Sequence, residues 1–171
     1  MKSWKIRSAM VAGLALSALL GQMVSGQAAQ AAGSADIWTV KLQNYAGMCL
    51  TIENGSLRNN TPALVSDCDK GLDNQVFELV PAWGGGQNVR AKHSGRCLKI
   101  SEDKQRVVQA WCSDTDDESQ RWNIFESQNG RQLNSVAAPE LCVWSGPGSG
   151  PARLASCAGT PAMFTFWDFT T

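Results

Sequence analysis

The 171 residues have balanced formal charge, with 15 Lys and Arg against 15 Asp and Glu, and 43% of them are hydrophobic. This composition argues against a chain built to bind nucleic acid or an anionic membrane, because such binding requires clustered cations. The length allows one domain with a substantial core and is too short for two once the N-terminal segment is set aside.

The first 31 residues have the pattern of a secretory signal peptide. Three cations precede an apolar run at 9–20, and Ala29-Gln30-Ala31 is a small-x-small cleavage motif. The run has 12 residues, whereas a bilayer span needs about 20, so a signal peptide is favoured over an uncleaved anchor. Cleavage after Ala31 would leave a secreted, extracellular chain of 140 residues with net charge −3.

The remaining chain predicts short β-strands separated by turns, with no helical periodicity. Ile37–Leu42 alternates before a turn at 44–47, and Phe77–Val80 ends a first unit. A second unit begins with a glycine-rich hairpin tip at 83–86 and a strand at 88–92.

The second unit continues with a strand at 107–111. A third unit starts at 122–126, turns at Asn129-Gly130, which favours a two-residue hairpin, and continues at 132–136. A Pro-Gly loop follows at 147–151. About four strands per unit predict roughly a dozen strands in all.

Six cysteines mark the same three units. The first of each unit are Cys49, Cys97 and Cys142, spaced by 48 and 45 residues, and the second are Cys68, Cys112 and Cys157, spaced by 44 and 45. A repeated period of this kind indicates three copies of one supersecondary unit. In an exported chain, six cysteines indicate a disulfide framework.

Two pairing schemes respect the repeat: one disulfide inside each unit, or a disulfide from each unit to the next. Pairing inside units closes loops of about 15 to 20 residues, each worth about 3 kcal/mol through the unfolded state. No pair has C-x-x-C spacing, so we expect no structural zinc site and no redox centre.

Motifs recur at the start and end of the units. Cys49–Ile52 and Cys97–Ile100 read C-L-x-I, while Gln75–Phe77 and Gln120–Trp122 read Q-x-F and Q-x-W. With three cysteine pairs in register, the chain resembles the ricin B-type lectins over about residues 36–171. The resemblance implies an all-β fold, the β-trefoil, in which three hairpins cap a six-stranded barrel with pseudo-threefold symmetry.

The resemblance also implies one disulfide per repeat: Cys49–Cys68, Cys97–Cys112 and Cys142–Cys157. It places a lectin domain at 32–171, with repeats at about 36–80, 81–126 and 127–171. In this family the aromatic residue of each Q-x-W motif lies in the core. This assigns Phe77, Trp122 and Phe166 to packing, in keeping with the large apolar area of such rings.

Sugar contacts in this family are an aspartate two residues after the first cysteine, an aromatic residue just before the second, and an Asn-Gln pair that overlaps Q-x-W. At the aspartate position the three units have Thr51, Lys99 and Trp144. The first unit has Ser66 at the ring position, and in the third unit Phe164 replaces the glutamine. No unit carries the full galactose-type set.

Two candidate carbohydrate sites remain. In the second unit a ring, two donors and a carboxylate would come from Trp111, Gln120, Ser119, and Glu102 or Asp103. Such groups stack on a sugar face and bind vicinal hydroxyls, although Trp111 could instead be buried beside Cys112. The set in the first unit lacks a ring and consists of Asn74, Gln75, Glu53 and Asn54.

Other features of the sequence bear on chemistry or docking. Trp83 and Trp144 stand in glycine-rich loops and are candidate exposed anchors for a ligand or a protein. His93 is the single histidine and lies in a polar turn, where we expect a solvated side chain. The acidic run at 114–118 lacks the glycine and distal glutamate of an EF-hand loop. We therefore expect no metal, no cofactor and no catalysis.

The sequence thus predicts a secreted, non-catalytic protein that binds a carbohydrate or glycoconjugate. The alternative is a trefoil with decayed sugar pockets that docks on a protein partner, similar to lectin-like subunits of bacterial toxins. A secreted hydrolase is a more distant alternative. We expect no nucleic-acid partner and no membrane span.

Overall fold

The computed structural model describes residues 37–171, which form thirteen β-strands and four 3-10 turns. No α-helix occurs in this range, as the sequence predicts. The predicted signal peptide at 1–31 lies outside the described residues. Within 37–171, no helix is long and apolar enough to cross a membrane.

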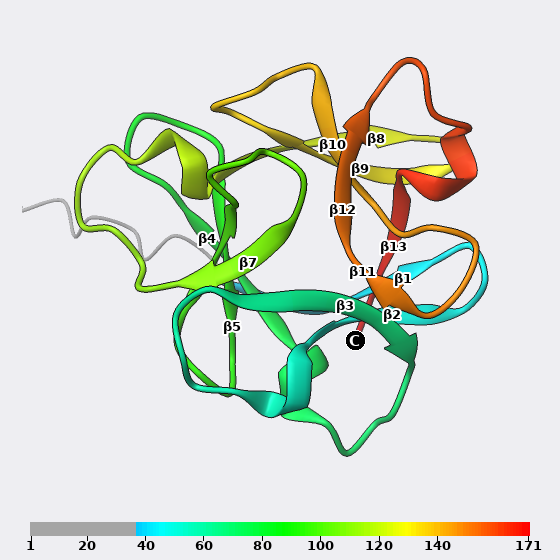
Figure 1. Cartoon of the computed structure of the whole chain (residues 1–171), viewed down its shortest axis with the longest axis horizontal. Helices are drawn as coiled ribbons and strands as arrows, with labels where there is room; N and C mark the ends of the chain where they lie inside the picture. The colour runs from blue at the N-terminus through cyan, green and yellow to red at the C-terminus, as the bar shows by residue number, and fades with distance from the viewer. Residues whose placement is uncertain (1–36) are drawn as a thin grey trace, which may run out of the picture. The chain divides into compact units, whose positions relative to one another are not determined.

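Six strands pair in a closed ring and form a barrel, and their labels can be found in Figure 1. They are β1 Trp38–Asn44, β4 Phe77–Pro81, β5 Gln87–Ala91, β8 Arg121–Ser127, β9 Gly130–Ser135 and β13 Phe166–Thr170. The antiparallel pairs run β1–β4, β4–β5, β5–β8, β8–β9, β9–β13 and β13–β1. In Figure 1 the last strand, in red, lies beside the first, in cyan. Each barrel strand thus has two neighbours, and closure removes the open edges of the sheet.

Three hairpins extend from the barrel end at which β1, β5 and β9 finish. They are β2 Met48–Ile52 with β3 Thr61–Asp67, β6 Cys97–Ile100 with β7 Val107–Ala110, and β10 Leu141–Trp144 with β12 Arg153–Ser156. A short strand, β11 Gly150–Pro151, pairs with β3 and so links the loop of the third hairpin to the first unit. Apart from the short β11, the strands form three four-stranded units, which is the expected β-trefoil.

Short 3-10 turns complete the units. They are η1 Glu53–Gly55 after β2, and η2 Asp73–Gln75, η3 Glu118–Gln120 and η4 Ala162–Phe164 before the closing strands β4, β8 and β13. The disulfides are Cys49–Cys68, Cys97–Cys112 and Cys142–Cys157, which confirms pairing inside units. Each one fastens the first strand of a hairpin to the segment that follows the second.

Three large rings fill the barrel: Phe77, Trp122 and Trp167 are 0%, 0% and 1% exposed. The Trp122 indole donates to the Leu98 carbonyl and the Trp167 indole to the Val143 carbonyl, both at 3.2 Å. The prediction of Phe166 as the third core ring is therefore wrong by one residue. Because side chains alternate along a strand, Trp167 points inward and its neighbour Phe166 is only partly buried.

The same shift corrects the third motif. Gln75, Gln120 and Thr165 are each 45 residues apart, so Thr165 occupies the glutamine position that the sequence assigned to Phe164. The turn predicted at Asn129-Gly130 also lies one residue earlier, because Ser127 pairs with Gly130. Gly130 then opens β9 with φ 115°, where a Cβ atom would lie 3.1 Å from the Trp167 carbonyl oxygen.

Candidate functional site

The fold creates the same place three times, between the first strand of each hairpin and the 3-10 turn before the closing strand. β2 contacts η2, and β6 contacts η3. In the third unit the ring of Trp144 at the end of β10 meets the ring of Phe164 in η4. Thr51, Lys99 and Trp144 therefore occupy comparable positions, and their surroundings can be compared directly.

In the first unit this place is filled by polar groups that satisfy one another. Thr51 is 7% exposed, and its hydroxyl lies 2.7 Å from the Ser66 hydroxyl. Asn74 donates to a β2 carbonyl at 2.8 Å. Glu53 and Asn54 lie in η1, which contacts η2, so the structure brings the predicted set of the first unit together. The set has no aromatic ring for a sugar face.

The glutamines of the first two motifs tie the segments around the second cysteines. Gln75 donates to the Asp67 carbonyl and accepts from the Asp69 N–H, both at 2.8 Å. Gln120 does the same on either side of Cys112, donating to the Trp111 carbonyl at 2.8 Å and accepting from the Ser113 N–H at 3.0 Å. Both are buried. Their position assigns them a structural role and leaves no free amide edge for a ligand.

In the second unit an ion pair occupies the comparable place. Lys99 Nζ lies 3.5 Å from Asp117 Oδ2, and Asp117 also accepts from the N–H and the hydroxyl of Ser119. Partial burial raises the pKa of the Asp117 carboxyl, but the Ser119 hydrogen bonds and the Lys99 ammonium outweigh it, so the pKa lies below its ordinary value. Ser119 and Lys99 thus stabilise the ionised carboxylate of Asp117.

The structure separates the residues predicted to form a site in the second unit. Glu102 and Asp103 line a cavity of about 380 Å³ together with Lys99 and Arg106. Asp103 pairs with Arg106 at 3.6 Å and accepts from the Ser101 hydroxyl, which lowers the pKa of its carboxyl. Trp111, Ser119 and Gln120 do not line this cavity. Trp111 is 64% exposed and carries the Arg96 guanidinium 4.1 Å from its ring centroid.

The third unit forms an open aromatic pocket of about 760 Å³, which we call the third-repeat pocket. Trp144 and Phe164 meet edge to face with centroids 6.2 Å apart, and Tyr45 packs edge-on against Phe164 at 5.4 Å. Arg153 lies directly opposite Trp144 in the β10–β12 pair. The 146–151 loop forms another wall. Gly146 lies so close to Trp144 that a Cβ atom would be 3.2 Å from its ring.

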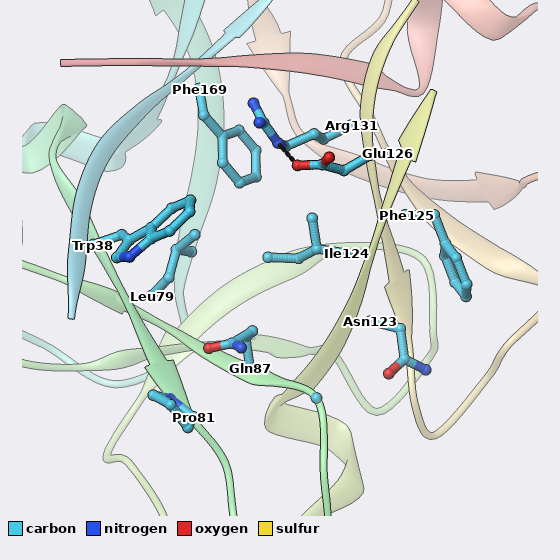
Figure 2. A pocket seen from close by; sticks show the side chains of 11 residues that line it. Trp38, Leu79, Pro81, Gln87, Asn123, Ile124, Phe125, Glu126, Arg131 and Phe169 are labelled. Carbon is cyan, nitrogen blue, oxygen red and sulfur yellow. Dashed lines mark hydrogen bonds and ion pairs between the residues drawn. The ribbon is translucent and has the colours of Figure 1, made fainter. Parts of the chain in front are cut away.

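A second large cavity, of about 670 Å³, lies at the barrel end away from the hairpins. Leu79, Ile124 and Phe169 form its floor, each two residues beyond a core ring. Figure 2 shows Ile124 pointing toward Trp38 and Leu79. Glu126 and Arg131 pair at 2.8 Å, and the Arg131 guanidinium lies 4.9 Å from the Phe169 centroid. The charged groups of this cavity therefore satisfy one another.

The two tryptophans predicted as exposed anchors differ. Trp83 is 80% exposed at the tip of the β4–β5 hairpin, as predicted. Its carbonyl accepts from the buried Arg121 guanidinium at 3.3 Å. Trp144 is only partly exposed, because it packs on Phe164 and Gly146. The prediction that Trp144 is an exposed anchor is corrected to a pocket wall.

Two polar predictions are also revised by the structure. His93 is partly buried, with Nε2 3.2 Å from the Ser56 carbonyl oxygen, so it is not the solvated side chain that we expected. Most of the acidic 114–118 run is exposed, but Asp116 and Glu118 pair with Arg121 at 2.9 and 3.3 Å. These carboxylates neutralise a buried cation that holds the Trp83 hairpin.

Comparison with known families bears directly on this architecture. Residues 38–132 match the model of the ricin-type beta-trefoil lectin domain. The chain belongs to this lectin family. The match ends within β9, so most of the third repeat lies beyond it. This boundary agrees with the strong departure of the third-repeat pocket from the family pattern.

Solved structures share the fold of this chain. The designed threefold-symmetric protein ThreeFoil has a TM-score of 0.67 at 20% identity, covering 78% of this chain and 98% of its own. The Rhizoctonia solani agglutinin has a TM-score of 0.66 at 18% identity, covering 80% and 96%. The C-half of the earthworm R-type lectin, in complex with GalNAc, has a TM-score of 0.58 at 14% identity, covering 77% and 98%. No curated protein sequence matches the chain.

The third-repeat pocket was not predicted as a carbohydrate site. Trp144 stands where the family has its aspartate, Phe164 stands just before the motif position Thr165, and Arg153 comes from the facing strand. Aligning the third motif on Thr165 by the constant 45-residue spacing would have paired Trp144 with Phe164. The position of Arg153 opposite Trp144 depends on the register of the β10–β12 hairpin, which sequence spacing alone does not give.

Proposed function

We propose that this protein is a secreted, non-catalytic lectin that binds saccharide in the third-repeat pocket. The observation that carries the proposal is the partly exposed aromatic wall of Trp144 and Phe164 in an open cavity of about 760 Å³. Such rings cover the apolar C–H face of a pyranose, while a few polar groups fix its orientation. The hydroxyls of Ser149 and Thr160 and the Arg153 guanidinium line the pocket as donors.

The comparison among repeats supports this choice. The equivalent place in the first unit is filled by the Thr51–Ser66 contact, and in the second by the Lys99–Asp117 pair. Desolvating such paired groups costs free energy that a saccharide hydroxyl must recover. The third-repeat pocket presents aromatic rings, and covering their apolar surface lowers the free energy of the complex.

Two tryptophan variants test the proposal. In Trp144→Ala we expect saccharide affinity to fall about tenfold or more, measured by calorimetry with a ligand chosen from a glycan array. Trp111→Ala is the matched control, because Trp111 is exposed and lies outside the pocket. Loss of binding in Trp111→Ala with Trp144→Ala unaffected would move the site to the second repeat, and an array with no bound glycan would sink the proposal.

Docking on a protein partner is the second candidate function, and the Trp83 hairpin favours it. An indole that is 80% exposed on a hairpin fastened by a buried arginine resembles the preorganised aromatic anchors of interfaces. Under this alternative, Trp83→Ala removes a partner interaction and leaves glycan binding unchanged. Co-purification from the native source with wild type and with Trp83→Ala separates the two functions.

A further inference from the structure

The charge of the third-repeat pocket is one-sided. Among the described residues that line it, Arg153 is the only charged one. Where the family has an aspartate this chain has Trp144, so this position carries no negative charge that would repel an anionic ligand. A lone guanidinium beside an indole defines a pocket with positive potential and an apolar floor.

Arg153 is also unpaired, in contrast to the other arginines of the strands. Arg90, Arg121 and Arg131 each pair with a carboxylate at 2.7 to 2.9 Å. Arg153 makes no ion pair and no side-chain hydrogen bond with any residue of 37–171. Arg106 forms an antiparallel β-bridge with Arg153 through the backbone, but the Arg106 side chain is paired with Asp103. The donors of Arg153 are therefore free to meet a ligand.

The hairpin register sets the relation between the guanidinium and the ring. Trp144 and Arg153 are directly opposed across β10 and β12, so their side chains leave the same face, with Cβ atoms about 5 Å apart. A pyranose stacked on the indole would hold a ring substituent near the guanidinium. The planar guanidinium fork matches a carboxylate through two parallel hydrogen bonds, which a hydroxyl cannot reproduce.

We propose that the third-repeat pocket selects saccharides that carry a carboxylate on the pyranose ring, of the uronic-acid type, with Arg153 as the residue that binds the carboxylate. This inference rests on the proposed saccharide function and specifies its ligand class. Trp144 supplies the surface for the sugar face, and Arg153 supplies discrimination between acidic and neutral sugars. The acidic ligand needs no metal ion in this arrangement, because the guanidinium itself carries the complementary charge.

A matched ligand pair tests the inference by NMR on ¹⁵N-labelled protein, followed through the Trp144 indole N–H. At low salt we expect methyl β-glucuronide to bind about tenfold or more tightly than methyl β-glucoside. In Arg153→Gln the ratio should approach one, chiefly because the glucuronide binds more weakly. Arg58→Gln is the control, because Arg58 is an exposed arginine outside the pocket, and its ratio should match the wild type.

The outcomes separate the two proposals. Equal affinity for both ligands in the wild type would overturn the acidic selectivity and leave saccharide binding at Trp144 standing. If no glycan binds on the array and no saccharide in solution moves the Trp144 signal, the proposed function and the inference are overturned together. Acetate is the ion control: if acetate alone shifts the signal at the same concentration as the glucuronide, Arg153 is a simple anion site and the inference fails.

Discussion

The second and third repeats of this protein build the same framework and place opposite chemistry on it. Trp122 donates to the carbonyl just before Lys99, and Trp167 donates to the carbonyl just before Trp144. Above these equivalent contacts, Lys99 is neutralised by Asp117, whereas Trp144 faces an unpaired Arg153. The core contact therefore sets the position of the pocket residue without setting its type.

The largest expected effect comes from removing the shared core ring. Trp122→Ala and Trp167→Ala should each cost about 3–5 kcal/mol of unfolding free energy, because each deletes a fully buried ring and leaves a cavity. Urea unfolding measures the loss. Phe166→Ala, one residue from Trp167, should cost about 1 kcal/mol, because that ring is only partly buried. A loss in Phe166→Ala that equals the loss in Trp167→Ala would refute the register of the third repeat.

An intermediate effect is expected from the glutamine that only the second of these repeats retains. Gln120→Ala should destabilise the protein by about 1–3 kcal/mol, because the Trp111 carbonyl and the Ser113 N–H lose their partner. Saccharide affinity, measured by calorimetry at a temperature where the variant is folded, should stay at the wild-type value. Lost affinity in a folded Gln120→Ala protein would show that the second repeat binds sugar after all.

The smallest expected effect comes from the ion pair of the second repeat. Lys99→Met should cost less than about 1 kcal/mol at pH 7, because both side chains are about one-third exposed. The variant should also raise the pKa of Asp117, which the Lys99 ammonium helps to lower. An NMR titration of the Asp117 carboxyl measures this change, and an unchanged pKa would remove Lys99 from the site.

Acid should weaken the second repeat in a defined direction. The folded-state pKa of Asp117 lies below its ordinary value, so its contribution to stability is present above about pH 4, the unfolded value. That contribution is lost as pH falls through the lowered folded value. In Lys99→Met this loss should be smaller and should be complete at a higher pH, and urea midpoints between pH 5 and pH 2 (roughly the range of carboxyl titration) measure it.

The sequence determined the fold. Two cysteine series with nearly constant spacing, together with C-L-x-I and Q-x-W motifs, specify three equivalent units. The disulfides and the apolar motif residues join segments that are close in the sequence, so a local pattern is enough to predict them. The family resemblance carried by these motifs predicted the disulfides inside units and the core rings Phe77 and Trp122, and the glycine-rich loop made Trp83 a candidate exposed residue. The third motif was misassigned by one residue, because Phe164, Phe166 and Trp167 are all aromatic and composition alone does not choose among them.

The candidate site depended on tertiary structure. Trp111 and Gln120 are nine residues apart in the sequence, and their side-chain types suit sugar stacking and hydrogen bonding. Gln120 is nevertheless buried, and Trp111 lies outside the nearby cavity. The third-repeat pocket joins Trp144, Arg153 and Phe164 from a hairpin and a following turn. Local sequence determines which side chains are available and how each strand alternates, whereas only the strand register and the packing of η4 decide which of them face one another across a pocket.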